Sequence, residues 1–94
     1  MRNFKIKVTP KESEVIQKLL FLARYTWGDD STEIMPTISP YLFFDNDNHN
    51  YQVLTKSNSE KRFNEVNHDE ITFDEFITEI EIELNKKFQN KSNY

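Results

Sequence analysis

The side chains best suited to chemistry in this sequence are carboxylates, aromatic rings and a few cations. The stretch RYTWGDD, residues 24–30, holds the only Trp and the only Gly of the chain, followed at once by two carboxylates. Paired carboxylates can perform acid–base catalysis when they occupy different environments inside a concave site. With 16 acidic residues among 94, adjacent carboxylates are also expected by chance, so these pairs alone do not predict an enzyme.

Other kinds of catalytic or cofactor site lack the residues they need. The chain has no Cys, which removes disulfides, thiolate zinc sites and thiol nucleophiles, and its single Gly excludes a Gly-rich phosphate loop. The turn DNDNHN begins like a calcium loop, with candidate ligands at Asp45, Asp47 and His49. It departs from the motif at Asn50 and Lys56, which stand where Gly and Glu are required. We therefore predict no catalytic residue, no cofactor and no metal.

The best candidate for a binding site combines aromatic rings with guanidinium groups. Such a set suits a nucleobase with its phosphate, or a hot spot for another protein. The alternative is that Tyr25 and Trp27 fold over a hairpin as core, with Arg24 on the surface. The candidate ligand-binding residues are Arg24, Tyr25, Trp27, Tyr41, Tyr51 and Arg62.

Charge is distributed unevenly along the chain. Residues 1–27 carry six basic and two acidic groups, net +4, whereas residues 28–94 carry six basic and fourteen acidic groups, net −8. An acidic surface repels nucleic acid phosphates and favours a basic partner, so we predict no direct DNA binding. Alternatively, these acidic residues form a helix face that contacts only solvent and binds no partner. The candidate partner-binding residues are Glu75, Glu79 and Glu83.

The first elements are a strand and a helix. The alternation in FKIKV, residues 4–8, predicts a half-buried strand with Lys5 and Lys7 on its polar face. The following TPKE is a capping box, so Thr9 starts a helix that ends near Tyr25. The apolar stripe of this helix is Val15, Ile16, Leu19, Leu22 and Ala23.

A long connection and a hairpin follow. The segment from Trp27 to Pro40 has two Pro and no period, and its Gly28 suits the chain reversal after the first helix. YLFF and YQVL flank a polar turn, which predicts a hairpin. The segment SNSEKRF then predicts a short helix, with Ser57 and Glu60 spaced as a capping box.

The segment DEITFDEF repeats the opening junction, with a short strand over residues 70–72 and a capping box from Thr72 to Glu75. The second main helix has the core stripe Phe73, Phe76, Ile77, Ile80 and Leu84. The order of elements predicts an α+β fold: a small, mostly antiparallel sheet of about four strands covered by two main helices. We expect one domain over residues 1–88 and a frayed tail over residues 89–94.

The expected localisation follows from the absence of long apolar segments in the sequence. The N-terminus has no continuous apolar run of the signal-peptide kind, and nowhere do ~18 apolar residues follow one another. We therefore expect a cytoplasmic protein without a membrane segment.

Four motifs, FKIKVTPKESEVIQKLLF, YTW, YLFF and EITFDEFI, are spread over residues 4–77 and resemble a type of small accessory protein encoded by tailed phages. Such proteins more often have a Gly just before the Tyr of YTW, where this chain has Arg24. The resemblance implies a context, because phage proteins of this size commonly bind and neutralise a host enzyme, a defence protein or a defence signal in the bacterial cytoplasm. No catalytic residue carries over from it.

Three functions are therefore under consideration. The leading hypothesis is a non-catalytic phage-type binding protein that counters a host function, antiphage defence, by docking on a host protein. The first alternative is a homo-oligomeric sponge that sequesters a nucleotide immune signal between subunits, since a domain this small has little room for an enclosed pocket. The second alternative is a small enzyme.

Overall fold

Five strands and three helices make up the chain in the computed structural model, which describes residues 1–35, 39–47 and 51–92. The strands are β1 (Phe4–Lys7), β2 (Thr26–Trp27), β3 (Tyr41–Asp47), β4 (Tyr51–Ser57) and β5 (Asp69–Glu70). The helices are α1 (Pro10–Leu22), α2 (Glu60–Glu65) and α3 (Phe73–Ser92). The predicted α+β class, with two main helices, is confirmed.

The strands form one mixed sheet in the order β2-β4-β3-β1-β5. The central pairs, β1 with β3 and β3 with β4, are antiparallel, whereas the two edge strands pair in parallel with β4 and β1. We expected about four strands. The fifth arises because Thr26 and Trp27 pair with Val53 and Leu54.

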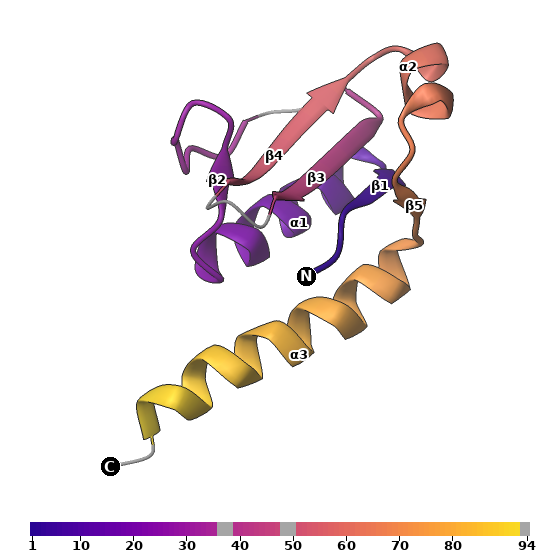
Figure 1. Cartoon of the computed structure of the whole chain (residues 1–94). Helices are drawn as coiled ribbons and strands as arrows, with labels where there is room; N and C mark the ends of the chain where they lie inside the picture. Colours follow the sequence, from indigo (N-terminus) through magenta and orange to yellow (C-terminus); the bar gives the residue numbers. More distant parts are fainter. Residues whose placement is uncertain (36–38, 48–50, 93–94) are drawn as a thin grey trace.

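Alternation along β3 divides its side chains between two hydrophobic clusters. Leu42 and Phe44 belong to the main core, to which α1 and α3 also contribute, while Tyr41 and Phe43 pack with Phe63 of α2. Figure 1 shows α3 running beneath the sheet and α2 lying on the side away from α3. The sheet is therefore covered on both faces, by two long helices on one and a short helix on the other.

The two predicted capping boxes are both present. Thr9 Oγ1 accepts from the Glu12 N–H at 3.2 Å, and Glu12 Oε1 accepts from the Thr9 N–H at 2.9 Å. Thr72 and Glu75 make the same reciprocal pair at 3.1 and 3.0 Å. Each box satisfies amide groups that a helix start would leave without partners, which is why α1 and α3 begin where the sequence predicts.

The start of α2 differs from the prediction by two residues. Ser59 is its N-cap, accepting from the Arg62 N–H at 3.1 Å. Ser57, the predicted cap, still belongs to β4, where it pairs with Tyr41. The prediction was wrong because the hairpin strands are longer than the apolar runs that identified them.

The end of α1 depends on Arg24, which has a φ of 73°. Its N–H donates to Phe21 O at 2.9 Å, and the Tyr25 N–H donates to Leu20 O at 2.9 Å. These two bonds are the Schellman arrangement, in which the left-handed residue reverses the chain. Gly28 has no positive φ, so the expectation that it makes this reversal was wrong.

Lys5 also departs from the prediction, because it is 9% exposed rather than on a solvated face. Its Nζ donates to Phe63 O at 2.6 Å and to Val66 O at 3.1 Å, and lies 4.7 Å from the centre of the Phe63 ring. These acceptors lie at the C-terminal end of α2, where carbonyl groups lack helical partners. Lys5 therefore attaches α2 to the sheet, while Lys7 is exposed.

Helix α3 continues to Ser92, so residues 89–92 of the expected frayed tail are helical, and residues 93–94 lie outside the described part. In Figure 1 its C-terminal half extends past the rest of the molecule. Within the described ranges, no helix is both long enough and apolar enough to cross a membrane.

Candidate functional site

Two of the candidate ligand-binding aromatics, Tyr25 and Trp27, lie in the main core. Their side chains are 2% and 6% exposed. The Tyr25 ring packs edge-on against Phe44 at 4.9 Å between centres, and Trp27 packs edge-on against Phe21 at 6.2 Å. Trp27 Nε1 donates to Glu33 O at 2.9 Å. The rings of Tyr25 and Trp27 therefore pack in the core, and the indole N–H of Trp27 holds the loop after β2.

The other candidates of this set lie elsewhere. Tyr41 is 8% exposed and stacks on Phe63 at 4.7 Å, on the opposite face of the sheet. The exposed Arg62 lies over Phe43, with 5.8 Å from its guanidinium carbon to the ring centre. The side chain of Tyr51 lies outside the described part of the structure. The structure thus does not bring the described members of the predicted cluster together.

Arg24, like Arg62, is exposed. In the described part of the chain its side chain makes no hydrogen bond, ion pair or ring contact. A left-handed conformation costs an L-residue roughly 1–2 kcal/mol, which a Gly would avoid. Arg24 therefore holds a free guanidinium on a backbone position that would be more stable with Gly.

The surroundings of Arg24 are apolar and basic. Leu22, expected in the core stripe, is 57% exposed because it lies on the side of α1 opposite the buried Ser13, Gln17 and Leu20. Lys87 of α3 donates to Ala23 O and lies 4.3 Å from the centre of the Tyr25 ring. We call Leu22, Arg24 and Lys87 the Arg24 turn. Of these three residues, Arg is the type that is enriched in protein-binding hot spots, and Leu22 adds exposed apolar surface beside it.

The three candidate partner-binding carboxylates already have partners within the chain. Glu75 accepts from the Thr72 N–H, and Glu83 accepts from the Tyr25 hydroxyl at 2.6 Å. Glu79 forms a two-point ion pair with the Arg2 guanidinium, at 3.0 and 3.1 Å. Docking of a host protein on these carboxylates stays a prediction, and it would compete with these contacts.

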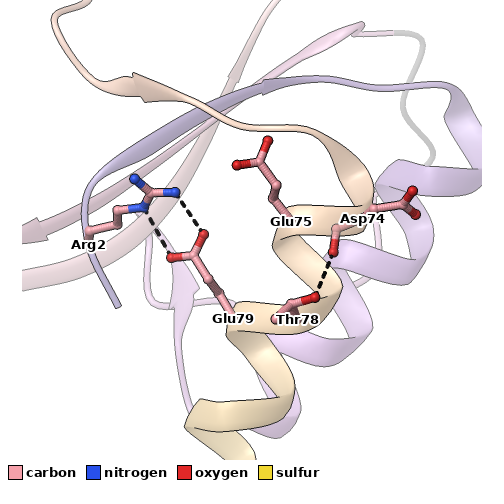
Figure 2. A pocket seen from close by; sticks show the side chains of 5 residues that line it. All are labelled: Arg2, Asp74, Glu75, Thr78 and Glu79. Atoms are coloured by element: carbon pink, nitrogen blue, oxygen red, sulfur yellow. Dashed lines mark hydrogen bonds and ion pairs between the residues drawn. The ribbon is translucent and has the colours of Figure 1, made fainter.

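Figure 2 shows an open groove beside the first turns of α3. Its volume is about 400 Å³, and its lining is Arg2, Asp74, Glu75, Thr78 and Glu79. The Arg2 guanidinium also contacts Asp69 at 3.0 Å, and its pairing with Glu79 raises the pKa of Arg2. The groove is thus an acidic surface partly neutralised by a cation from the segment before β1.

Tyr25 and Glu83 shift each other's pKa at the place where the end of α1 packs against α3. Burial, and then the hydrogen bond to Glu83, raise the pKa of Tyr25. That hydrogen bond lowers the pKa of Glu83, and Lys87, 3.9 Å away, acts in the same direction. Perturbed groups of this kind occur at functional sites and in structural networks. Since Tyr25 is covered, we assign this pair to stability.

The chain has two histidines, His49 and His68, either of which has a side chain suited to metal binding or acid–base chemistry. His68 Nε2 is hydrogen-bonded to Asp45 Oδ1 and joins β3 to the segment before β5. His49 and the Asp47 side chain lie outside the described part, so the calcium-like turn cannot be placed. Within the described ranges, no three His, Cys, Asp or Glu side chains gather in a way that could hold a metal ion.

Comparisons with protein-family models, with curated proteins and with solved structures find no match to this chain. Sequence reasoning included Arg24 but missed Leu22 and Lys87. One sequence feature pointed to this turn: the charged Arg24 stands directly before Tyr25, at a place where a Gly would be expected to end the first helix.

Proposed function

We propose that this chain is a non-catalytic binding protein that docks on an acidic and apolar surface of a host protein through the Arg24 turn. The observation that carries the proposal is Arg24 itself, an exposed and unpaired guanidinium, among the described residues, at a φ of 73°. Backbone strain that a Gly would relieve is retained in proteins mainly where the side chain has a use.

The chemistry of the turn supports a protein partner. Arg is among the residues that contribute most at protein interfaces, and Leu22 supplies an adjacent apolar contact. The Arg24 guanidinium has no anionic partner among the described residues, whereas Lys87 is paired with Glu83, so the partner surface should offer a carboxylate to Arg24. The resemblance to phage accessory proteins supports a bacterial host protein, and antiphage defence as the function that is countered.

Sequestration of a nucleotide has less support. The Tyr25 and Trp27 rings are 2% and 6% exposed, so neither offers a face on which a base could stack. The two arginines of the predicted cluster lie on different elements, Arg24 after α1 and Arg62 on α2. Release of a nucleotide on heat denaturation of the purified protein would restore this alternative.

The Arg24→Gly variant tests the proposal, because it removes the guanidinium and relieves the strain together. We expect the free energy of unfolding to rise by about 1 kcal/mol, since Gly adopts a positive φ without steric cost. Loss of a hot-spot Arg costs ~2 kcal/mol or more, so affinity for the host protein should fall about 30-fold. Protection of a phage from the defence system should be lost with it.

Two further variants separate charge from backbone. Arg24→Lys keeps a cation and should retain part of the affinity. Arg62→Gly, on α2, removes another exposed Arg, remote from the turn, and should leave affinity unchanged. The measurements are plating efficiency on a defence-carrying host and affinity for the partner recovered from it. Full protection by Arg24→Gly would overturn the proposal.

A further inference from the structure

The side of α3 that faces away from the sheet has an exposed apolar residue near the middle of the helix. Ile82 is 51% exposed, whereas Phe76 and Ile80, on the opposite side, are 0% and 1% exposed. Figure 1 shows the sheet and the other helices all on one side of α3. The outer face of α3, which we define as Glu75, Thr78, Ile82 and Lys86, is exposed at all four positions.

Charge on α3 changes sign between Glu83 and Lys86, just beyond Ile82. The helix up to Ile82 carries Asp74, Glu75, Glu79 and Glu81, with no Lys or Arg. After Ile82 come Glu83, whose carboxylate accepts a hydrogen bond from the Tyr25 hydroxyl, and then Lys86 and Lys87. Both the acidic half and the basic half reach the surface, since Glu75 and Lys86 are exposed.

We propose that this outer face pairs two copies of the chain, with their α3 helices antiparallel and the twofold axis at Ile82. Thr78 and Lys86 lie four residues before and after Ile82, so each Lys86 would lie opposite Thr78 of the second copy. Glu75, one turn earlier, would lie within ~5 Å of Lys86 of the second copy along the axis, at 1.5 Å of rise per residue.

The charges select this occupant and this orientation. A helix that is acidic in one half and basic in the other complements a second copy only when the two run antiparallel, and every contact then occurs twice. A parallel pair would place Glu75 against Glu75 and Lys86 against Lys86. The pairing does not involve Arg24, so it is independent of the proposed function.

The absence of Cys from the natural chain allows a direct test by disulfide formation. An axis at position 82 brings the two Ile82→Cys side chains together, so the oxidised variant should form covalent dimers. The control is Leu22→Cys, because Leu22 is similarly exposed at 57% but lies on α1. We expect at least ten times faster cross-linking of Ile82→Cys. Equal or slower cross-linking would overturn the proposal.

Charge exchange tests the orientation. In an antiparallel pair, Glu75→Lys and Lys86→Glu each create repulsion within their own dimers, but an equimolar mixture restores two attractive contacts. Light scattering should show monomers for each variant alone and dimers for the mixture, with the wild-type dimer weakening as salt rises. Circular dichroism checks that Glu75→Lys, which loses its bond to Thr72, is folded. A mixture that stays monomeric, or a monomeric wild type at all concentrations, would refute the pairing.

Discussion

The Tyr25 hydroxyl donates a 2.6 Å hydrogen bond to Glu83 Oε1, although 58 residues separate them in the sequence. Tyr25 follows the turn that ends α1, and Glu83 lies in the middle of α3. Lys87 adds an ion pair with Glu83 and a hydrogen bond to Ala23 O. This contact holds the two long helices together at the end of α1, and its titration makes stability depend on pH.

In acid, Glu83 should make the protein less stable. Its folded-state pKa lies below the value in the unfolded chain, roughly 4.3, because the charged form accepts a hydrogen bond from Tyr25. The unfolded chain therefore binds more protons, and the contribution of Glu83 is present above that pH and lost as pH falls through the folded-state pKa. Urea unfolding between pH 7 and pH 3 should show a shallower loss for Glu83→Gln than for the wild type. Parallel curves would contradict this.

In alkali, ionisation of Tyr25 should likewise make the protein less stable. Its folded-state pKa is raised by burial above the unfolded value of about 10, so its contribution is complete below pH 10 and lost as pH rises further. Tyr25→Phe should reduce the fall in stability between pH 9 and pH 11. At pH 7 the same variant should lose about 1.5–3 kcal/mol, the usual value of a hydrogen bond to a charged group. A fall in alkali as steep as that of the wild type would rule out this role.

Removal of the Lys5 ammonium should loosen α2. Lys5→Met keeps much of the apolar length but leaves the carbonyl groups of Phe63 and Val66 without their donor. We expect a loss of about 1–3 kcal/mol, together with faster hydrogen exchange of the α2 amides. Lys7→Met is the matched control, because Lys7 lies on the same strand and is exposed. Equal effects of the two variants would show that the buried contact is unimportant.

Local features of the fold were predictable from the sequence. The capping boxes at Thr9 and Thr72 involve residues three apart, so their position does not depend on tertiary structure. The alternation in β1 similarly placed Phe4 and Ile6 on one face, and both lie in the main core. The α+β class followed from these local features.

Features that depend on distant contacts were not predictable. The alternation along β1 places Lys5 on the other face of the sheet from Phe4. It does not reveal that α2 covers Lys5 on that face. Likewise, the spacing of apolar residues along α1 did not reveal that the core covers the face of Ser13, Gln17 and Leu20, which leaves Leu22 exposed on the opposite side. The reversal at Arg24 has no Gly to mark it in the sequence, and one of its two hydrogen bonds joins Tyr25 to Leu20, whose side chains are both buried in the main core.

The loop after β2 should depend on Gln17, a fully buried residue of α1. Its Oε1 accepts from the Met35 N–H at 2.7 Å, and its Nε2 donates to Met35 O and Ser13 Oγ, each at 3.1 Å. The amide thus satisfies both backbone groups of Met35, as a neighbouring strand would. In Gln17→Leu the Met35 N–H and C=O lose their partners at about 1–3 kcal/mol each, so the free energy of unfolding should fall by ~2–6 kcal/mol.

Fluorescence gives a local readout of the Gln17→Leu change. Trp27 is the only Trp, and its Nε1 donates to Glu33 O in the same loop. Loosening of the loop should therefore expose the indole and shift its emission to longer wavelength while the protein is still folded. Lys18→Leu changes the exposed neighbour on α1 and should leave the emission unchanged. If the Met35 backbone lost its partners in Gln17→Leu, its N–H and C=O would carry the cost of desolvation. Native-like emission and stability in this variant would therefore show that contacts other than Gln17 hold Met35.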